Sequence, residues 1–248
     1  MNLHKVSSDF KKAPFPAVMA LISFVLFVFI YYFITVRSVK PYYFMGLIFA
    51  IPFASFAAIT IFTVKEKLKS KVAVILTSVL TVIMPIVMCF AFIFMAMMAS
   101  IDTVTDLSKY HRVLKLKDYE NNELIKHFPS KIPSNAKDAI FNYQPGFLQG
   151  GEEYRLKFTT DVNTIESYTK ELSQIAKWIG KSSNREVEIN GVEMVSFDNF
   201  GYNKLPLDFT IYLIVSEPYK PFDWNHGELS LVAVSKQRSE IIFFAEDW

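Results

Sequence analysis

Three long apolar runs occupy the first hundred residues and constrain the fold more than any other feature of the chain. They cover residues 15–36, 42–64 and 72–99, and none contains an Asp, Glu, Lys, Arg or His. A helix needs about 20 apolar residues to cross a hydrocarbon core of about 30 Å, and one central charge costs roughly 2.5–3.5 kcal/mol of insertion free energy. Residues 1–100 are therefore predicted to form a membrane region of three transmembrane helices.

The charges divide the chain into a basic and an acidic part. Residues 1–100 carry nine Lys/Arg and two Asp/Glu, whereas residues 101–248 carry 17 and 22, so that the total of +2 conceals two opposite halves. Such a division predicts two environments. We expect a juxtamembrane stalk over residues 101–117 and a water-soluble α+β domain over residues 118–248.

The loop charges predict the orientation of the spans. The residues before the first span and the loop 65–71 lie on one side of the membrane and together carry seven Lys/Arg, whereas the loop 37–41 carries two. Lys and Arg are enriched in cytoplasmic loops. The N-terminus is therefore predicted to be cytoplasmic and the C-terminal domain extracytoplasmic, in a multi-pass protein of the cell membrane.

Small residues recur at four-residue spacing in the second span, at Gly46, Ala50 and Ala54. Small residues at this spacing allow helices to approach closely. They predict either a seam with a protein partner or a second copy of the chain, or packing against the first and third spans, which we favour. Ion and proton pathways normally need ionisable groups inside the membrane, so a transporter is not expected. The lipid bilayer itself is the one partner that this region requires.

One main helix is predicted in the soluble domain, over residues 161–179. Apolar residues recur there at three- and four-residue steps, which is typical of a helix with one buried face. Asn163 with Glu166 resembles a capping box, and Asp161 is the alternative cap. Gly180 is expected to end the helix.

The remaining patterns predict a sheet. A short helix is expected over residues 119–127, and the dipeptide Asn190-Gly191 indicates a hairpin between two strands. Further strands are expected over residues 139–143, 153–158, 209–215, 229–234 and 241–245. The predicted fold class is a membrane α-helical region followed by an α+β domain, with a mostly antiparallel sheet packed by one main helix.

No catalytic motif is present in the sequence. It contains no phosphate-binding glycine loop, no His-Glu-x-x-His, no Cys-x-x-Cys and no Gly-x-Ser-x-Gly. The three histidines of the soluble domain, His111, His127 and His226, fall in different elements, whereas a zinc site usually takes two ligands from one element. We expect no cofactor, no metal site, no identified catalytic residue and no nucleic-acid partner.

Two loops are candidates for contacts with other molecules. Asp223, Trp224 and His226 form a polar and aromatic cluster, which predicts a ligand loop or, alternatively, a turn with Trp224 in the core. Phe147 and Leu148 lie between turn signals at a hairpin tip. Exposed apolar tips mark partner or membrane contacts, and the alternative is that both residues fold back over the core.

One segment resembles known sequences. His127-Phe128-Pro129, Ile132-Pro133, Ala136 and residues 145–151 are similar to a pattern in uncharacterised membrane-associated proteins of Gram-positive bacteria. The resemblance covers about 25 residues and brings no activity with it. It implies a bacterial envelope protein.

Three functions remain open from the sequence. The first is a membrane protein that presents an extracytoplasmic binding or interaction domain, which the absence of catalytic motifs favours. The second is a membrane-anchored, hydrolase-like enzyme whose site is assembled from carboxylates by the fold. The third is an accessory subunit of a transport or export complex.

Overall fold

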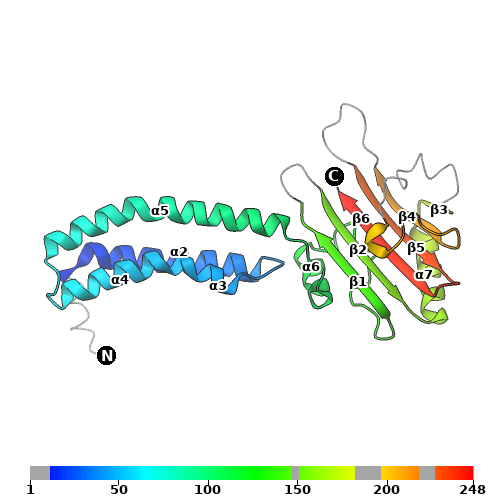
Figure 1. The fold of residues 1–248 in the computed structure, drawn as a ribbon, viewed down its shortest axis with the longest axis horizontal. Coiled ribbons are helices and arrows are strands. Elements are labelled where there is room, and N and C mark those ends of the chain that lie inside the picture. Colours follow the sequence, from blue (N-terminus) through cyan, green and yellow to red (C-terminus); the bar gives the residue numbers. More distant parts are fainter. Residues whose placement is uncertain (1–11, 147–150, 182–196, 218–226, 248) are drawn as a thin grey trace. The chain divides into compact units, whose positions relative to one another are not determined.

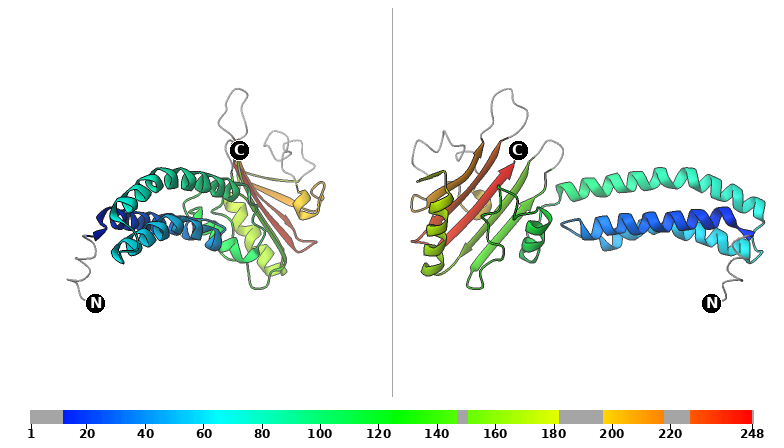
Figure 2. Two further views of the ribbon diagram at one scale, coloured as in Figure 1. Left: turned by 60° about the vertical axis from the view of Figure 1, so that its left-hand side comes forward. Right: turned by 180° about the vertical axis from the view of Figure 1, so that it is seen from behind.

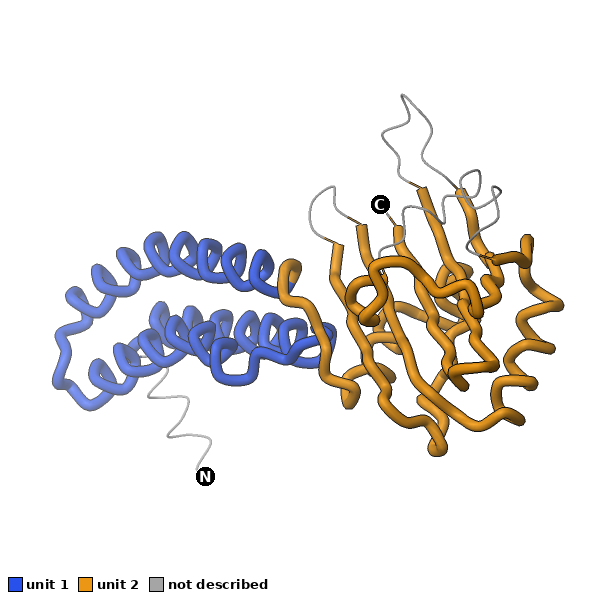
Figure 3. The backbone as a smooth tube through the Cα atoms, turned by 45° about the vertical axis from the view of Figure 1, so that its right-hand side comes forward, with its two compact units in different colours: residues 1–99 blue, residues 100–248 orange. Residues whose placement is uncertain are grey.

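The chain forms two compact units, Met1–Ala99 and Ser100–Trp248, in a computed structural model (Figure 3). The structure describes residues 12–146, 151–181, 197–217 and 227–247. Three long apolar helical spans are followed along the chain by an antiparallel sheet of six strands (Figure 1). The predicted fold class is confirmed.

The first unit contains three candidate membrane spans, Pro14–Val36, Tyr43–Val64 and Ser70–Ile101. Helix α2 is the first span and helix α5 the third. The second span is irregular, because helix α3 (Tyr43–Gly46) is followed by a 3-10 turn (Leu47–Ala50) before helix α4 (Ile51–Val64). Pro52 lies in the first turn of α4, where a missing backbone N–H is tolerated.

Helices α2 and α4 form a closely packed pair, whereas α5 is mostly exposed. The rings of Phe24 and Phe53 lie 5.1 Å apart between the two paired helices. Only Ala73, Thr77 and Met95 are buried among the 32 residues of α5. The pair is therefore held by protein contacts, while most of α5 faces the surroundings of the unit.

The second unit is built on an antiparallel sheet in the order β1-β2-β6-β5-β4-β3. Five strands coincide with the predicted ones, and the complete set is β1 (Lys137–Gln144), β2 (Glu152–Thr159), β3 (Trp178–Gly180), β4 (Thr210–Glu217), β5 (Glu228–Ser235) and β6 (Glu240–Asp247). Strand β6 is buried between β2 and β5 and reads as a nearly continuous apolar run. Such a run is typical of a strand covered on both faces.

The main helix is shorter than predicted. Helix α7 covers Val162–Ile175, and Asp161 caps it through its side chain, which accepts a hydrogen bond from Thr164 N at 3.0 Å. Residues 178–180 form β3 instead of the last helical turn, because Lys177 N donates to Leu213 O at 2.7 Å and the strand pairs with β4. An unpaired strand edge offered better partners than a further turn of helix.

The short helix expected over residues 119–127 is wrong, since that segment consists of turns. A helix lies earlier, as α6 (Tyr110–Leu116), after a 3-10 turn at Leu107–Lys109. The hairpin predicted at Asn190-Gly191 lies outside the described residues.

The segment that we expected to be a stalk contributes to the core of the second unit. Tyr110, Val113 and Leu114 of α6 are buried, and the ring of Tyr110 contacts that of Phe141 on β1 at 5.2 Å. Val104 exchanges two backbone hydrogen bonds with Tyr143, at 2.8 and 2.9 Å, beside the outer edge of β1. These contacts cover part of an edge strand that would otherwise be open to pairing.

Both faces of the sheet are covered. Helices α6 and α7 lie on one face (Figure 2), where Tyr168 of α7 packs on Phe158 and Phe243 at 6.3 and 5.7 Å. The other face carries an apolar cluster that includes Leu231, Phe244 and, from the segment before β4, Phe209. The sheet is thus packed by one main helix on one side, as predicted, and by an irregular segment on the other.

Candidate functional site

A cavity of about 370 Å³ lies in the second unit between α7 and the segment Lys126–Lys131. One wall is formed by Tyr168, Glu171, Leu172 and Ile175 of α7. The opposite wall combines lysine, histidine, phenylalanine, proline and serine side chains within six consecutive residues. The cavity therefore brings cations, an acid, aromatic rings and hydroxyl groups to one place.

Helix α6 holds the irregular wall in position. Tyr110 OH donates a hydrogen bond to Pro129 O at 2.6 Å, and His111 Nδ1 lies 3.2 Å from Ser130 O. Phe128 anchors the same segment from the other side, because its buried ring contacts Phe243 of β6 at 5.3 Å. A segment without regular structure is thus fixed by two carbonyl contacts and one core ring.

Helix α7 supplies the regular wall through its amphipathic pattern. Ile165 and Leu172 are buried against the sheet, whereas Glu171 is exposed at the mouth of the cavity. Tyr168 is half-buried between the two, and burial together with the charge of Glu171 raises its pKa to about 12. Its phenol is therefore protonated, and able to donate a hydrogen bond, throughout the physiological range.

His127 connects the cavity to the sheet. Its Nε2 lies 3.0 Å from Ser230 Oγ of β5, and the hydroxyl of Ser230 donates to Phe244 O at 3.2 Å. A carbonyl can only accept, so the serine oxygen is left to accept a hydrogen bond from Nε2–H. The other ring nitrogen, Nδ1, then carries a lone pair. This atom is buried and has no hydrogen-bond partner among the described residues.

The imidazole of His127 is neutral at neutral pH. Its pKa falls from 6.5 to about 3, mainly because the ring is buried and to a smaller extent because of the charge of Lys126. The residue keeps some exposed surface where it lines the cavity. A buried acceptor without a donor costs free energy, so Nδ1 favours a water, hydroxyl or N–H group beside it.

Two lysines and one acid, Glu171, line the cavity. Lys126 forms an ion pair with Glu123, one turn away. Lys131 lies at the other end of the same wall. Because Glu123 offsets the charge of Lys126, the surroundings of Lys131 are the part of the lining that favours an anionic group.

The distance between Ser230 and His127 is that of a nucleophile and its base, yet the pair has no access to a substrate. Ser230 has no exposed surface, since it lies in the central strand β5. Its hydroxyl hydrogen is directed to the carbonyl of Phe244. The contact with Ser230 therefore holds the imidazole of His127 in place, and the two residues do not form a catalytic site.

Acidic residues form a row across one end of the sheet. Glu152, Asp247, Glu228 and Glu217 are direct cross-strand neighbours on β2, β6, β5 and β4. Glu152 is neutralised, because Lys117 pairs with it and the hydroxyls of two tyrosines donate to it. No group of three His, Cys, Asp or Glu side chains within the described ranges has the spacing of a metal site.

Burial raises the pKa of Glu228, and the charges of Glu217 and Asp247 add to the shift. Like charges directly opposite each other destabilise a sheet. The adjacent acids Glu152 and Glu153 do not converge, since Glu153 pairs with Arg155 while Glu152 pairs with Lys117. Glu152 and Glu153 are thus no assembled carboxylate pair.

The sequence-predicted site residues fall in different places. Phe147 and Leu148, and likewise Asp223, Trp224 and His226, lie outside the described residues. The three small residues of the second span differ in burial: Gly46 is buried, Ala50 is half-buried and Ala54 is exposed. The 3-10 turn between Gly46 and α4 breaks the four-residue repeat that would align them.

Gly46 allows a close approach within the unit. A Cβ atom at this position would lie 2.6 Å from Ile34 Cδ1 and 3.1 Å from Tyr31 Cδ2, both on α2. The glycine therefore lets α3 approach the chain's own first span.

Sequence reasoning missed the cavity. The motif search finds His127 as one of three scattered histidines, and its partner Ser230 lies 103 positions away. No local pattern signals such a contact, because it depends on which strand the segment 126–131 crosses. The wall residues His127, Phe128 and Pro129 do begin the segment on which the family resemblance rests.

Comparisons with other proteins assign this chain to no family. The chain matches no protein-family model, no curated protein and no solved structure. The resemblance to Gram-positive membrane-associated proteins therefore stays a prediction from the sequence.

Proposed function

We propose that this chain is a membrane protein that presents its α+β unit outside the cytoplasm as a binding domain, with the cavity between α7 and residues 126–131 as the binding site. The observation that carries the proposal is the cavity itself, whose lining brings Lys126, Lys131 and His127 together with aromatic and hydroxyl groups. Binding sites for small molecules are concave and combine a few polar groups with apolar surface.

The lining defines the chemistry of the ligand. An anionic group suits Lys126 and Lys131, and a hydroxyl group suits the phenol of Tyr168, which also lines the cavity. Phe128 and Leu172 add a small apolar surface between these polar ends. The class that fits is a small hydroxylated phosphate or carboxylate, such as glycerol 3-phosphate.

Thermal unfolding of the full-length protein in detergent tests the proposal. We expect glycerol 3-phosphate to raise the unfolding temperature, inorganic phosphate to raise it less, and glycerol to leave it unchanged, because a ligand stabilises the state that binds it. Lys131→Gln is expected to remove most of the shift.

The matched control is Lys137→Gln, since Lys137 is an exposed lysine on β1 outside the cavity. This variant should keep the full response to glycerol 3-phosphate. An equal response in the Lys131→Gln protein, or no response in the unaltered protein, would contradict the proposed site.

Two observations support the orientation in this proposal. The N-terminal residues and the loop between α4 and α5 hold most of the lysines of the membrane region. Lys12, just before α2, forms an ion pair with Glu66 of that loop at 3.0 Å, so both segments lie at the same end of the helices.

A further inference from the structure

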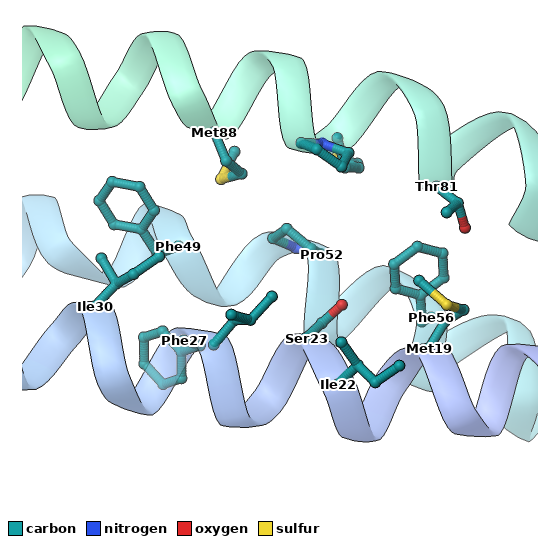
Figure 4. Close-up of a pocket in the computed structure, with 13 residues that line it drawn as sticks. Met19, Ile22, Ser23, Phe27, Ile30, Phe49, Pro52, Phe56, Thr81 and Met88 are labelled. Carbon is teal, nitrogen blue, oxygen red and sulfur yellow. The ribbon is translucent and has the colours of Figure 1, made fainter.

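A second cavity lies inside the membrane unit, between α2, α4 and α5, with a volume of about 140 Å³ (Figure 4). Thirteen side chains line it, and none of them is ionisable. Met19, Met84 and Met88 contribute flexible thioether chains, which adapt to irregular apolar partners. The hydroxyl of Thr81 is already bonded to Thr77 O at 2.7 Å.

The cavity exists because α5 touches the other two helices near its ends and not at its middle. Its buried residues are Ala73 and Thr77 toward one end and Met95 toward the other, where Phe92 also contacts Phe49 at 6.4 Å. Figure 1 shows α5 curving over the α2–α4 pair. The residues that line the cavity, Thr81 to Met88, fall between these contacts.

Two prolines line the gap and keep it open. Pro85 lies inside α5 and removes the hydrogen bond to the carbonyl of Thr81, which bends a helix. Pro52 lies across the gap, at the irregular start of α4 (Figure 4). Pro85 therefore favours a bend in α5 at the level of the cavity.

The position of the cavity along the helices indicates what kind of molecule occupies it. It lies at mid-length of both α2 and α5, where a bilayer presents hydrocarbon tails. Ile22 and Leu26 line the cavity and are also 46% and 54% exposed, so the cavity is continuous with the lipid-facing surface of α2. Phe49 and Phe56 also line the cavity and are buried.

An apolar cavity of about 150 Å³ stays dry in a soluble protein and takes up small hydrocarbons. From these observations we infer that the cavity is an intramembrane lipid site, filled by a segment of one acyl chain of a bilayer lipid that enters between α2 and α5. The chain replaces the packing contacts that α5 does not make with the protein. This inference is independent of the binding function proposed for the second unit.

Photolabelling of the full chain in phosphatidylcholine vesicles tests the site. A small fraction of the lipid carries a diazirine at the middle of one acyl chain, and the labelled residues are mapped by mass spectrometry. We expect labelling of Met84 and Met88 to exceed that of Val82 and Phe90 several-fold. The latter two residues are 65% and 71% exposed on the same helix and meet only exchanging lipid.

Filling the cavity provides the second arm. Ser23→Leu and Thr81→Leu each add carbon atoms to the lining and are expected to lower the labelling of Met88 several-fold while leaving Phe90 unchanged. Val82→Leu, on the exposed face of α5, is the matched control and should change neither. If neither filled variant stays monodisperse in detergent, the ratio of Met88 to Phe90 labelling in the unaltered protein decides alone.

Two results would overturn the inference. One is equal labelling of lining and outward-facing residues, which would mean that no chain is retained. The other is a disulfide between two copies through Met88→Cys in a Cys89→Ser background, which would place a second protein chain at the cavity.

Discussion

At the scale of single residues, burial keeps the imidazole of His127 neutral. A neutral imidazole that donates through Nε2 to Ser230 must carry an acceptor at Nδ1. A protonated ring would lose that acceptor and place a charge beside Lys126. The protonation of His127 therefore links the stability of the unit to pH.

We predict that the second unit loses stability as the pH falls below 6.5. The pKa of His127 is depressed to about 3 in the folded state, so the unfolded state binds the proton more tightly between these two values. Each unit of such a shift corresponds to about 1.4 kcal/mol. The loss should be seen in unfolding temperatures measured by tryptophan fluorescence between about pH 7 and about pH 4.

His127→Gln should flatten this dependence, because glutamine does not titrate. His111→Gln is the control, as His111 also contacts the segment 126–131 but is exposed. A pH profile of the His127→Gln protein parallel to that of the unaltered protein would show that the buried imidazole is not the group responsible.

A second residue-scale prediction concerns the acidic row. The pKa of Glu228 is raised above 4.5, so the folded state disfavours its charged form and loses stability as the pH rises through that range. Glu228→Gln should therefore raise the unfolding temperature at neutral pH, by an amount equivalent to roughly 0.5 kcal/mol. The gain should disappear below pH 4.5. Glu120→Gln, at an exposed acid in a turn, should show no comparable gain.

At the scale of elements, helix α7 begins and ends for different reasons. Its start is local, because Asp161 accepts from Thr164 N one turn later and its side chain also contacts Asn135. Its end is tertiary, because the chain after Ile175 joins the free edge of β4. Since α7 forms one wall of the cavity, both ends position the candidate site.

We predict that Asp161→Ala lowers the thermal stability of the soluble unit, whereas Asp161→Asn retains most of it, because asparagine keeps the capping oxygen. The hydrogen bonds from Thr164 lower the pKa of Asp161 below 3.8. This contribution is therefore present above that value and is lost as the pH falls through the folded pKa. Equal unfolding temperatures for the Ala and Asn proteins would contradict the role of the cap.

Helix α5 shows how an element adapts to the membrane. Its 32 residues exceed the length that the bilayer requires, whereas α2 has 23. A long span tilts or bends to match the hydrocarbon thickness. Pro85, inside α5, favours such a bend and also lines the cavity of the membrane unit.

At the scale of the whole molecule, the orientation can be measured with the single cysteine removed. In a Cys89→Ser background, a cysteine at Ser38 should react in intact cells with a maleimide that does not cross membranes. A cysteine at Ser70 should react only after the cells are opened, because the lysine-rich loop before α5 is predicted to be cytoplasmic. The reverse pattern would place the soluble unit in the cytoplasm.

The amino-acid sequence alone determined the three spans and the five main strands, because hydropathy and alternation act between residues that are close in the chain. It left two caps open for α7, and the structure has the cap at Asp161. Only the tertiary structure decided that residues 178–180 leave the helix for β4, that α6 enters the core and that His127 meets Ser230. These outcomes depend on sheet order and on which strand edges remain unpaired. The two cavities are also tertiary outcomes, because each depends on where neighbouring elements contact one another and where they do not.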